Sequence, residues 1–445
     1  MKNSKEFASS LTIAEKIKQL RVSKGISQMK LAMAIGSNQP TIVRIEKGQA
    51  EYSPEKLELA KKELDIEGMP LTDAERALFF NRLYIVRDLT RARRVSEARN
   101  KLKGMAKLVN LEPCDYDLAM LYRLIEIQLL MIEGDFKTAD KMFSHPSICP
   151  DNMNEENQYC YHSYKGYYEL SHDRYETSLS HLHKALEIVE DDDRFSPDDL
   201  YRLYLNIAVC YSNLEYPYCA ILSALKAKGM CNENALSDFS LYLNRILSRN
   251  YIKVDRLAEA KKLLDKCIVQ AESLSDTLLI GLTTYDYGCL NIEKAEWKMA
   301  ETHFDKAMSY FKEGSANYYM AFFYKIHSVI FAREFPKAKK MIEHAKEKYS
   351  SDKVWAQYFE NVNYYLRLAQ RPSLSDNAEL TGYLENVAIP CFFENNDYFL
   401  SSKYCQLLKN HYDKIGSQMR SLLMTELMYK IQSRCLIGPE GGISP

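Results

Sequence analysis

The stretch ISQMKLAMAIGSNQPTIVRIEKG, residues 26–48, reads as two short helices separated by a glycine. Ser27 is a favourable N-cap for the first helix, which Gly36 ends. Asn38 is an N-cap for the second helix, which Gly48 ends. Two helices joined by a glycine-containing turn form the layout that presents a recognition helix to the major groove of DNA.

Apolar spacing extends this segment on both sides. A stripe from Ile13 to Leu20 predicts a preceding helix, which Gly25 ends. Pro54 starts a following helix that contains Leu57, Leu59 and Leu64. The sequence therefore predicts a small helical head over residues 12–64.

The quoted stretch resembles the helix-turn-helix of the phage-repressor (XRE-like) family. Arg21 and Glu46 match a structural ion pair of that family, which ties the first helix to the end of the recognition helix. Glutamine pairs well with adenine and arginine with guanine, which suits a recognition helix. Pro40 departs from the small polar residue common in the family. The resemblance implies DNA contacts by Gln28 and Asn38 (phosphate), Gln39 and Arg44 (base edges), and Thr41 and Lys47 (sugar-phosphate).

Charge separates this head from the rest of the chain. Residues 1–50 contain nine Lys or Arg and three Glu, a net charge of +6 in a chain whose total is −1. The remaining residues therefore have a net charge of −7. A basic head on an acidic body suits a head that contacts phosphate and a body that does not.

Composition indicates a mostly helical protein, because its 445 residues include only 16 glycines and 13 prolines. The length predicts two to four units or a repeat array. Eleven cysteines without a C-x-x-C pair indicate reduced thiols. No signal-peptide pattern and no apolar run long enough for a membrane span occur. We therefore expect a cytoplasmic protein without membrane association.

A repeated pattern covers most of the acidic body. It reads G-x-x-[bulky], then [aromatic]-x-x-A-x-x-x-[bulky]-x-x-A, and one copy contains Gly288, Trp297, Ala300, Phe304 and Ala307. Small residues let paired helices approach closely, and each pair must stack on its neighbours to bury its apolar face. The last small residue recurs at Ala185, Ala227, Cys267, Ala307 and Ala345, in steps of 42, 40, 40 and 38 residues.

The pattern resembles the tetratricopeptide repeat, although HEAT-type repeats are an alternative at this spacing. The predicted fold is all-α, with a helix-turn-helix domain followed by a right-handed tetratricopeptide-repeat superhelix. The predicted domains are residues 1–68 (DNA-binding), 69–78 (linker), 79–432 (peptide-binding and dimerisation) and 433–445 (flexible tail).

In tetratricopeptide repeats the first helix of each pair lines a concave groove. Asn206 there could bond both the C=O and the N–H of an extended peptide. Arg245 and Arg249 share one helix face and could hold a carboxylate. Packing or solvent exposure is the alternative reading for each position. The predicted peptide-binding residues are Asn206, Arg245, Arg249, Tyr164, Tyr167, Tyr285, Asp286, Tyr324 and His327.

No catalytic motif occurs in the chain, so we predict neither an enzyme nor a cofactor. His181 and His183 are two residues apart and face different sides of a helix, which is poor geometry for metal ligands. The acidic run at residues 190–194 is better explained as a loop between repeats than as a cation site. We expect no metal.

A repressor-type head followed by tetratricopeptide repeats is similar to the RRNPP family of Gram-positive bacteria (Rgg, Rap, NprR, PlcR and PrgX). Length and repeat number are closest to the NprR-like and Rap-like members, and Asn206 is the best single match. The resemblance implies a quorum-sensing transcription regulator that binds a short linear signalling peptide. It also implies a homodimer on a pseudo-palindromic DNA operator. A repeat array that binds a protein such as a response regulator is one alternative. A helical enzyme or scaffold with a vestigial head is another.

Overall fold

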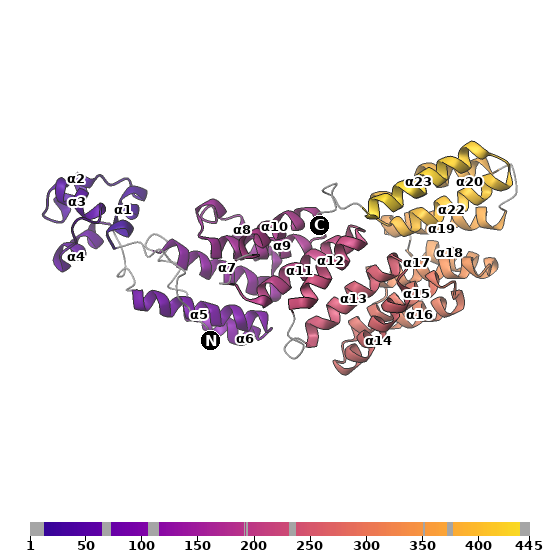
Figure 1. The fold of residues 1–445 in the computed structure, drawn as a ribbon, viewed down its shortest axis with the longest axis horizontal. Coiled ribbons are helices and arrows are strands. Elements are labelled where there is room, and N and C mark those ends of the chain that lie inside the picture. Colours follow the sequence, from indigo (N-terminus) through magenta and orange to yellow (C-terminus); the bar gives the residue numbers. More distant parts are fainter. Residues whose placement is uncertain are drawn as a thin grey trace. The chain divides into compact units, whose positions relative to one another are not determined.

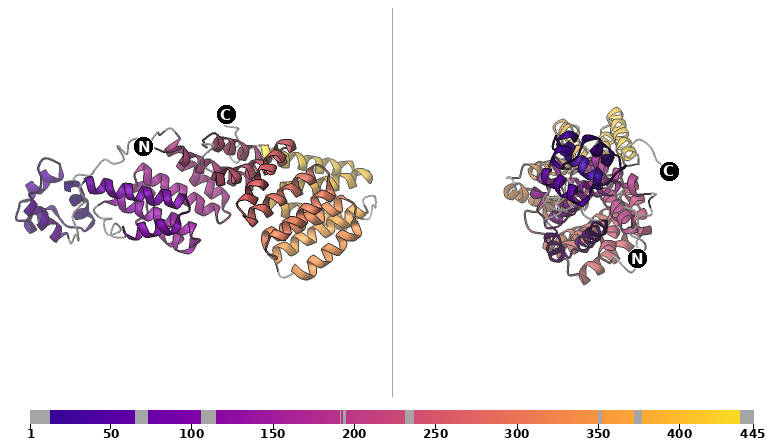
Figure 2. Two further views of the ribbon diagram at one scale, coloured as in Figure 1. Left: turned by 90° about the horizontal axis from the view of Figure 1, so that it is seen from below. Right: turned by 90° about the vertical axis from the view of Figure 1, so that its left-hand side faces the viewer.

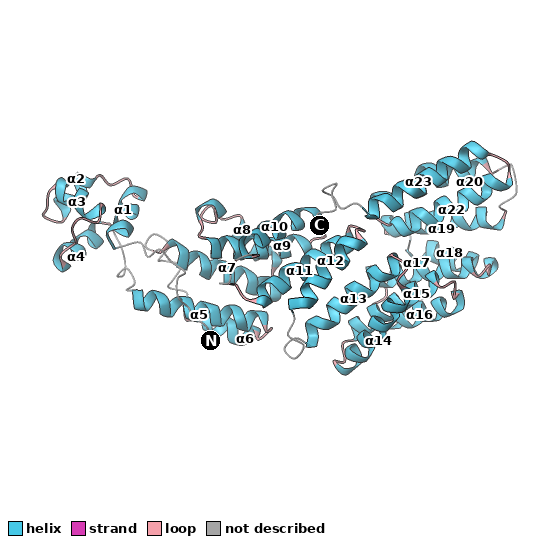
Figure 3. Cartoon of the chain, in the orientation of Figure 1, coloured by secondary structure: helices cyan, strands magenta, loops and turns pink. Residues whose placement is uncertain are grey.

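The computed structural model describes residues 13–64, 73–105, 115–190, 192, 195–230, 237–349, 352–371 and 377–436 (Figure 1). All regular elements in these ranges are helices, and none is a strand (Figure 3). The chain divides into two compact units, residues 1–193 and 194–445. None of the described helices is both long enough and apolar enough to cross a membrane.

The first unit begins with four short helices, drawn in indigo in Figure 1. The side chains of Ser27, Asn38 and Ser53 each accept a backbone N–H three residues along the chain and thereby cap the second, third and fourth helices. The helices are α1 (Ile13–Ser23), α2 (Gln28–Ala34), α3 (Gln39–Glu46) and α4 (Pro54–Glu63).

These four helices surround a small apolar core of their own. The buried face of α4 passes through Ala60, with Leu64 just beyond the end of the helix and Leu57 partly buried. Leu59 lies outside that face and is 45% exposed. The buried core residues are Ile17, Leu20, Leu31, Ala32, Ile35, Ile42, Ala60 and Leu64.

Three helix pairs follow in the first unit. The first of these helices begins at Asp73, inside the stretch predicted as a linker, and its Arg76 Nε lies 2.6 Å from Asp115 Oδ2. Residues 73–78 are therefore helical, and residues 69–72 lie outside the described ranges. The pairs are α5 (Asp73–Arg91) with α6 (Val95–Lys103), α7 (Tyr116–Ile132) with α8 (Phe136–Phe143), and α9 (Glu155–Leu170) with α10 (Tyr175–Val189).

The described residues of the second unit form six further pairs, and Figure 2 shows its helices lying side by side. In the fifth pair a π-helical turn, Leu384–Ala388, interrupts the second helix. Residues 437–445 of the predicted tail lie outside the described ranges. The pairs are α11 (Pro197–Asn213) with α12 (Pro217–Met230), α13 (Ser237–Lys253) with α14 (Leu257–Ser273), α15 (Thr277–Glu293) with α16 (Trp297–Tyr310), α17 (Ala316–Phe331) with α18 (Phe335–Tyr349), α19 (Lys353–Gln370) with α20 (Ala378–Tyr383) and α21 (Ile389–Glu394), and α22 (Tyr398–Lys414) with α23 (Gln418–Leu436).

In the second unit, the first helices of consecutive pairs contact one another. Helix α11 contacts α13, α13 contacts α15, α15 contacts α17, and α17 contacts α19. We call these five helices the first-helix layer. Side chains from pairs that are distant in sequence can therefore meet on one surface.

In eight of the described helix pairs, a left-handed residue lies in the turn, two positions before the second helix. Two of these residues are glycines, and a non-glycine residue in this conformation costs roughly 1–2 kcal/mol. The eight residues are Arg93, Gly134, Asp173, Glu215, Asp255, Ala295, Arg333 and Gly416, with φ between +56° and +84°.

Small residues in the first helix of a pair make room for bulky side chains of the second. A Cβ added to Gly288 would lie 2.5 Å from Phe304 Cε1, and one added to Gly166 would lie 2.8 Å from Leu182 Cδ2. Ser178 Oγ also donates a hydrogen bond to Gly166 O at 2.7 Å. The repeated pattern in the sequence thus corresponds to close contacts between the two helices of a pair.

We expect Gly288→Ala to lower the free energy of unfolding by about 1–3 kcal/mol, because the new methyl group overlaps the Phe304 ring in a packed interior. Gly229→Ala in α12 is the matched control, since a Cβ there meets nothing within 4 Å. Denaturant unfolding followed by circular dichroism measures both. Equal stability of the two variants would contradict the close-approach assignment.

Candidate functional site

The recognition helix α3 has one buried face and one exposed face. Ile42 and Ile45 are buried in the head, whereas Gln39, Arg44 and Lys47 are exposed. The side chains predicted to reach base edges therefore point away from the core. This is the arrangement that a helix needs in order to enter a DNA groove.

Asn38 holds the start of the recognition helix. Its Oδ1 accepts hydrogen bonds from Thr41 N at 3.0 Å and from Thr41 Oγ1 at 2.7 Å. Both residues were predicted to lie against the sugar-phosphate backbone. The amide nitrogen of Asn38 keeps its two N–H donors, which suit a phosphate oxygen.

A buried ion pair joins α1 to the end of α3. Arg21 Nε lies 2.7 Å from Glu46 Oε1, and Arg21 Nη2 lies 3.1 Å from Glu46 Oε2. Arg21 Nη1 also donates to Ile26 O at 2.8 Å. The pair that the family resemblance implied is therefore present as a bidentate contact, which sets the angle at which α3 is presented.

Gln28 also bonds Glu46. Its Nε2 donates to Glu46 Oε2 at 2.7 Å, an interaction that the sequence did not predict. An amide nitrogen has two N–H groups, so Gln28 can keep this bond and still donate to a phosphate. The contact orients the side chain at the start of α2.

The second candidate surface lies on the first-helix layer of the second unit. Arg245 Nε lies 2.8 Å from Asp286 Oδ2, and Arg249 Nε lies 3.8 Å from Asp286 Oδ1. The carboxylate that the two arginines face is thus one of this chain's own residues. Burial raises the pKa of Asp286, and the two arginines oppose that rise.

Asn206, on α11, is half-buried. Within the described residues its side-chain amide makes no hydrogen bond, although nearby amides such as Asn213 bond their own helix at Val209 O. A half-buried amide without a partner has its full hydrogen-bonding capacity available for a ligand.

The aromatic positions differ in their exposure. Tyr285 is half-buried and packs against Tyr324 with ring centroids 5.9 Å apart. Tyr324 is only 8% exposed, and its ring stacks on Phe399 of α22. Burial raises the pKa of both tyrosines well above the ordinary value. Of the two tyrosines, Tyr285 is the more accessible to a ligand.

His327 is a core residue, so the prediction that it contacts a peptide was wrong. It is 0% exposed, its Nδ1 lies 3.0 Å from Phe323 O, and its Nε2 lies 3.3 Å from Tyr404 Oη. Burial lowers its pKa to about 4, so the ring is neutral near pH 7. Helix α22 covers this position, which repeat spacing alone could not reveal.

Tyr164 and Tyr167 belong to the first unit and are not brought together with the others by any described contact. Tyr164 is 4% exposed and sits in the interior, which contradicts its predicted accessibility. Tyr167 is 37% exposed, as a ligand-contacting residue should be.

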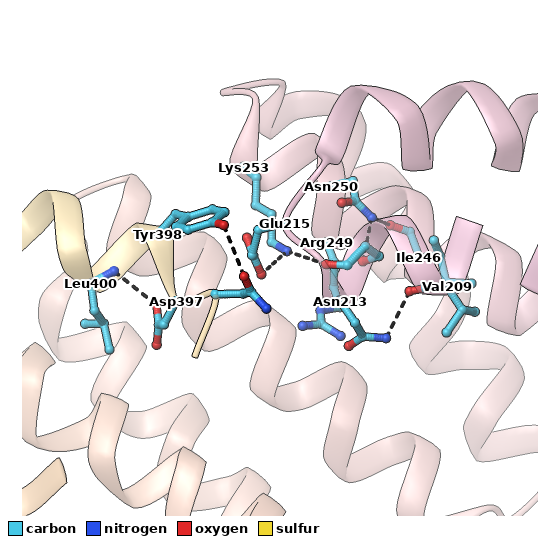
Figure 4. A network of polar contacts seen from close by, with 12 residues as sticks. Val209, Asn213, Glu215, Ile246, Arg249, Asn250, Lys253, Asp397, Tyr398 and Leu400 are labelled. Atoms are coloured by element: carbon cyan, nitrogen blue, oxygen red, sulfur yellow. Dashed lines mark hydrogen bonds and ion pairs between the residues drawn. The ribbon is translucent and has the colours of Figure 1, made fainter. Parts of the chain in front are cut away.

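Polar residues of α11, α13 and the start of α22 that were not predicted from the sequence lie near one another (Figure 4). Lys253 Nζ donates to Glu215 Oε1 at 2.7 Å, next to the left-handed turn after α11. Asp397 caps α22 by accepting Leu400 N at 3.1 Å, and Tyr324 Oη donates to it at 3.5 Å. These residues are ordinary turn and helix-end residues in sequence, so only the folded chain shows that they meet.

Over the described ranges, no group of three or more His, Cys, Asp or Glu side chains is arranged to hold a metal ion. His162 Nδ1 and His181 Nδ1 lie 3.0 Å apart as a pair without a third ligand of these types. Most of the acidic run at 190–194 lies outside the described residues.

Comparison with known proteins supports the two-part architecture. A helix-turn-helix family model matches residues 17–67. The transcriptional activator NprA of Geobacillus stearothermophilus is 22% identical over 307 residues, 66% of this chain and 73% of that protein. These matches agree with a DNA-binding head.

Solved structures show the fold of the body. The apo form of the quorum sensor NprR from B. thuringiensis is 17% identical, with a TM-score of 0.61 over 81% of this chain and 100% of that chain. A Rap protein in complex with competence and sporulation factor is 16% identical, with a TM-score of 0.60 over 80% and 98%. The predicted all-α fold, a helix-turn-helix head followed by helical repeats like those of the NprR and Rap structures, is confirmed.

The buried carboxyl of Asp397 predicts a pH-dependent stability. Burial raises its pKa to about 7, with Glu215 adding to the rise while the Leu400 N–H and Lys253 oppose it. The folded chain therefore holds a proton that the unfolded chain releases, and the free energy of unfolding falls as pH increases from about 4 to about 7.

Asp397→Asn should flatten this dependence, because the amide keeps the capping oxygen and loses the titrating proton. Denaturant unfolding of both proteins between about pH 5 and pH 8 measures the difference. Asp276→Asn, the same substitution at the cap of α15, is the control. Parallel stability curves for wild type and Asp397→Asn would refute the assignment.

Proposed function

We propose that this chain is a cytoplasmic transcription regulator whose DNA binding is controlled by a short signalling peptide. The main support for this proposal is that one chain combines an exposed recognition helix with helical repeats of the NprR fold. A solved structure of NprR in complex with its cognate peptide NprX has a TM-score of 0.59 over 80% of this chain. The curated relative is a transcriptional activator, which supports a regulator rather than an enzyme.

On this proposal, two copies of the chain bind a pseudo-palindromic operator, with Gln39 and Arg44 of each copy at base edges. The two recognition helices would enter successive major grooves on one side of the duplex. Peptide binds the first-helix layer at α11, α13 and α15, where Asn206 bonds its backbone. Tyr285 borders this surface and supplies apolar area with a polar tip.

A protein partner is the second candidate. Tyr218, Leu222 and Leu225 lie one to two turns apart on α12 and are 45%, 58% and 42% exposed. A stripe of this kind on an outward helix suits a protein surface. Under this reading the repeats dock a protein, and peptide has no effect on DNA binding.

Arg44→Ala should weaken binding to the preferred DNA site by about 10- to 100-fold while leaving non-specific binding nearly unchanged, since one base contact contributes roughly 1–3 kcal/mol. The site is first selected from random duplexes, and affinity is then measured by fluorescence anisotropy. Lys62→Ala, an exposed cation on α4, is the control. An unchanged footprint of Arg44→Ala would remove the recognition-helix assignment.

Asn206→Ala should reduce the peptide response at least about tenfold without changing DNA affinity, because it removes two backbone hydrogen bonds to the peptide. The assay is DNA-binding anisotropy with synthetic peptides encoded beside the gene. Asn213→Ala on the same helix is the control, since that amide already bonds Val209 O. If no peptide changes the DNA affinity of the wild-type protein, the result favours the protein-partner alternative. If Asn206→Ala responds to peptide as strongly as wild type, Asn206 does not bind the peptide backbone.

A further inference from the structure

A cluster of charged side chains where α13 meets α15 has a surplus of positive charge next to the proposed peptide surface. Arg245 and Arg249 share a single carboxylate, Asp286, whose side chain is 1% exposed. The neighbouring Lys253 is neutralised by Glu215 at 2.7 Å. Two guanidinium groups and one carboxylate leave one positive charge without a counter-ion in this cluster.

The hydrogen-bonding capacity of the two arginines is also unused. Both contacts with Asp286 are made through Nε, and within the described residues the terminal amino groups of the two side chains make no hydrogen bond. The Arg249 side chain is 32% exposed and the Arg245 side chain 16%. Guanidinium groups are among the strongest hydrogen-bond donors to carboxylates. Guanidinium N–H groups that are partly shielded from water and make no hydrogen bond therefore indicate a ligand-binding position.

Two buried polar atoms on α13 and α15 support the same conclusion. Asn250 Oδ1 on α13 and Thr283 Oγ1 on α15 have no hydrogen-bond partner, although both residues are 0% exposed. Buried polar atoms are nearly always bonded, and exceptions mark strain or an absent ligand or water. Asn250 lies on α13 together with both arginines, and Thr283 lies on α15 together with Asp286. Each of the two helices that form the charged cluster thus also has an unsatisfied buried polar atom.

We infer that the arginine pair, Arg245 and Arg249, binds a carboxylate of the regulating peptide. The inference rests on the proposed function and adds the chemical class of the ligand. Asp286 acts as a positioning residue that holds the two guanidinium groups in place. The net positive charge of the arginine pair repels a cationic group from the same place. The carboxylate comes from the peptide's C-terminus or from an Asp or Glu side chain.

The test uses the full-length chain and four pools of synthetic random hexapeptides, with retention after gel filtration measured by mass spectrometry. One pool has neutral side chains and a free C-terminus. The second is the same pool with an amidated C-terminus. The third and fourth are amidated pools with one added Asp or one added Lys.

We expect retention of the first or the third pool and little of the second and fourth. Retention of the first pool alone assigns the C-terminal carboxylate, and retention of the third alone assigns a side chain. Equal retention of the amidated neutral pool overturns the carboxylate inference but leaves peptide binding intact. Failure of wild type to retain any pool overturns both this inference and the proposed function.

Variants locate the interaction on the arginine pair. Arg249→Gln should lower retention of the carboxylate pool about 10- to 100-fold, as expected for a hydrogen bond between charged groups. Arg249→Lys keeps the positive charge but lacks the planar, paired N–H donors of the guanidinium group, so it should retain only part of the binding. Arg256→Gln, whose side chain is paired with Glu259 outside the cluster, is the control. Unchanged retention by Arg249→Gln, with an unchanged thermal melt, would refute the assignment.

Discussion

In the pairs α9–α10 and α15–α16 the two helices approach closely at a small residue, and the packing of these pairs depends on that contact. At Gly288 there is no room for a methyl group beside Phe304. That spacing lets the second helix fill the space between neighbouring first helices, and it brings the first helices of consecutive pairs into contact. Without this layer, side chains as distant in sequence as Asn206, Arg249 and Asp286 would have no common surface. The candidate ligand site is therefore a product of the repeat packing.

Most of the fold could be predicted from sequence because its determinants are local. Caps such as Ser27 and Asn38 act within one helical turn, and the repeated small residues have a fixed spacing. The turns between helices could not be predicted in the same way. They share a left-handed conformation, but residues as different as Ala295 and Arg333 adopt it, so residue type carries little information about it.

The candidate sites likewise contain some residues that could be predicted from the sequence and others that could not. Arg21 and Glu46 could be matched to each other because a family pattern names both positions. On the repeats, spacing predicts which face of a helix is turned inward but not what covers it. His327 lies on the predicted face and is nevertheless enclosed by α22, which is seventy residues further along the chain. Likewise, Asp286 appeared as a ligand contact in sequence and proves to be the counter-ion of the two arginines.

Helix α13 has a mechanical property that follows from its spacing. Arg245, Arg249 and Lys253 are each four residues apart, so they lie along one edge of a rod about 12 Å in length between the first and the last. Lys253 bonds Ser212 O of α11 and Glu215 in the turn that leads into α12. Because a helix is stiff, a rotation of α13 at the arginine pair would also move these two contacts. Helix α13 therefore connects the charged cluster mechanically with the neighbouring helix pair.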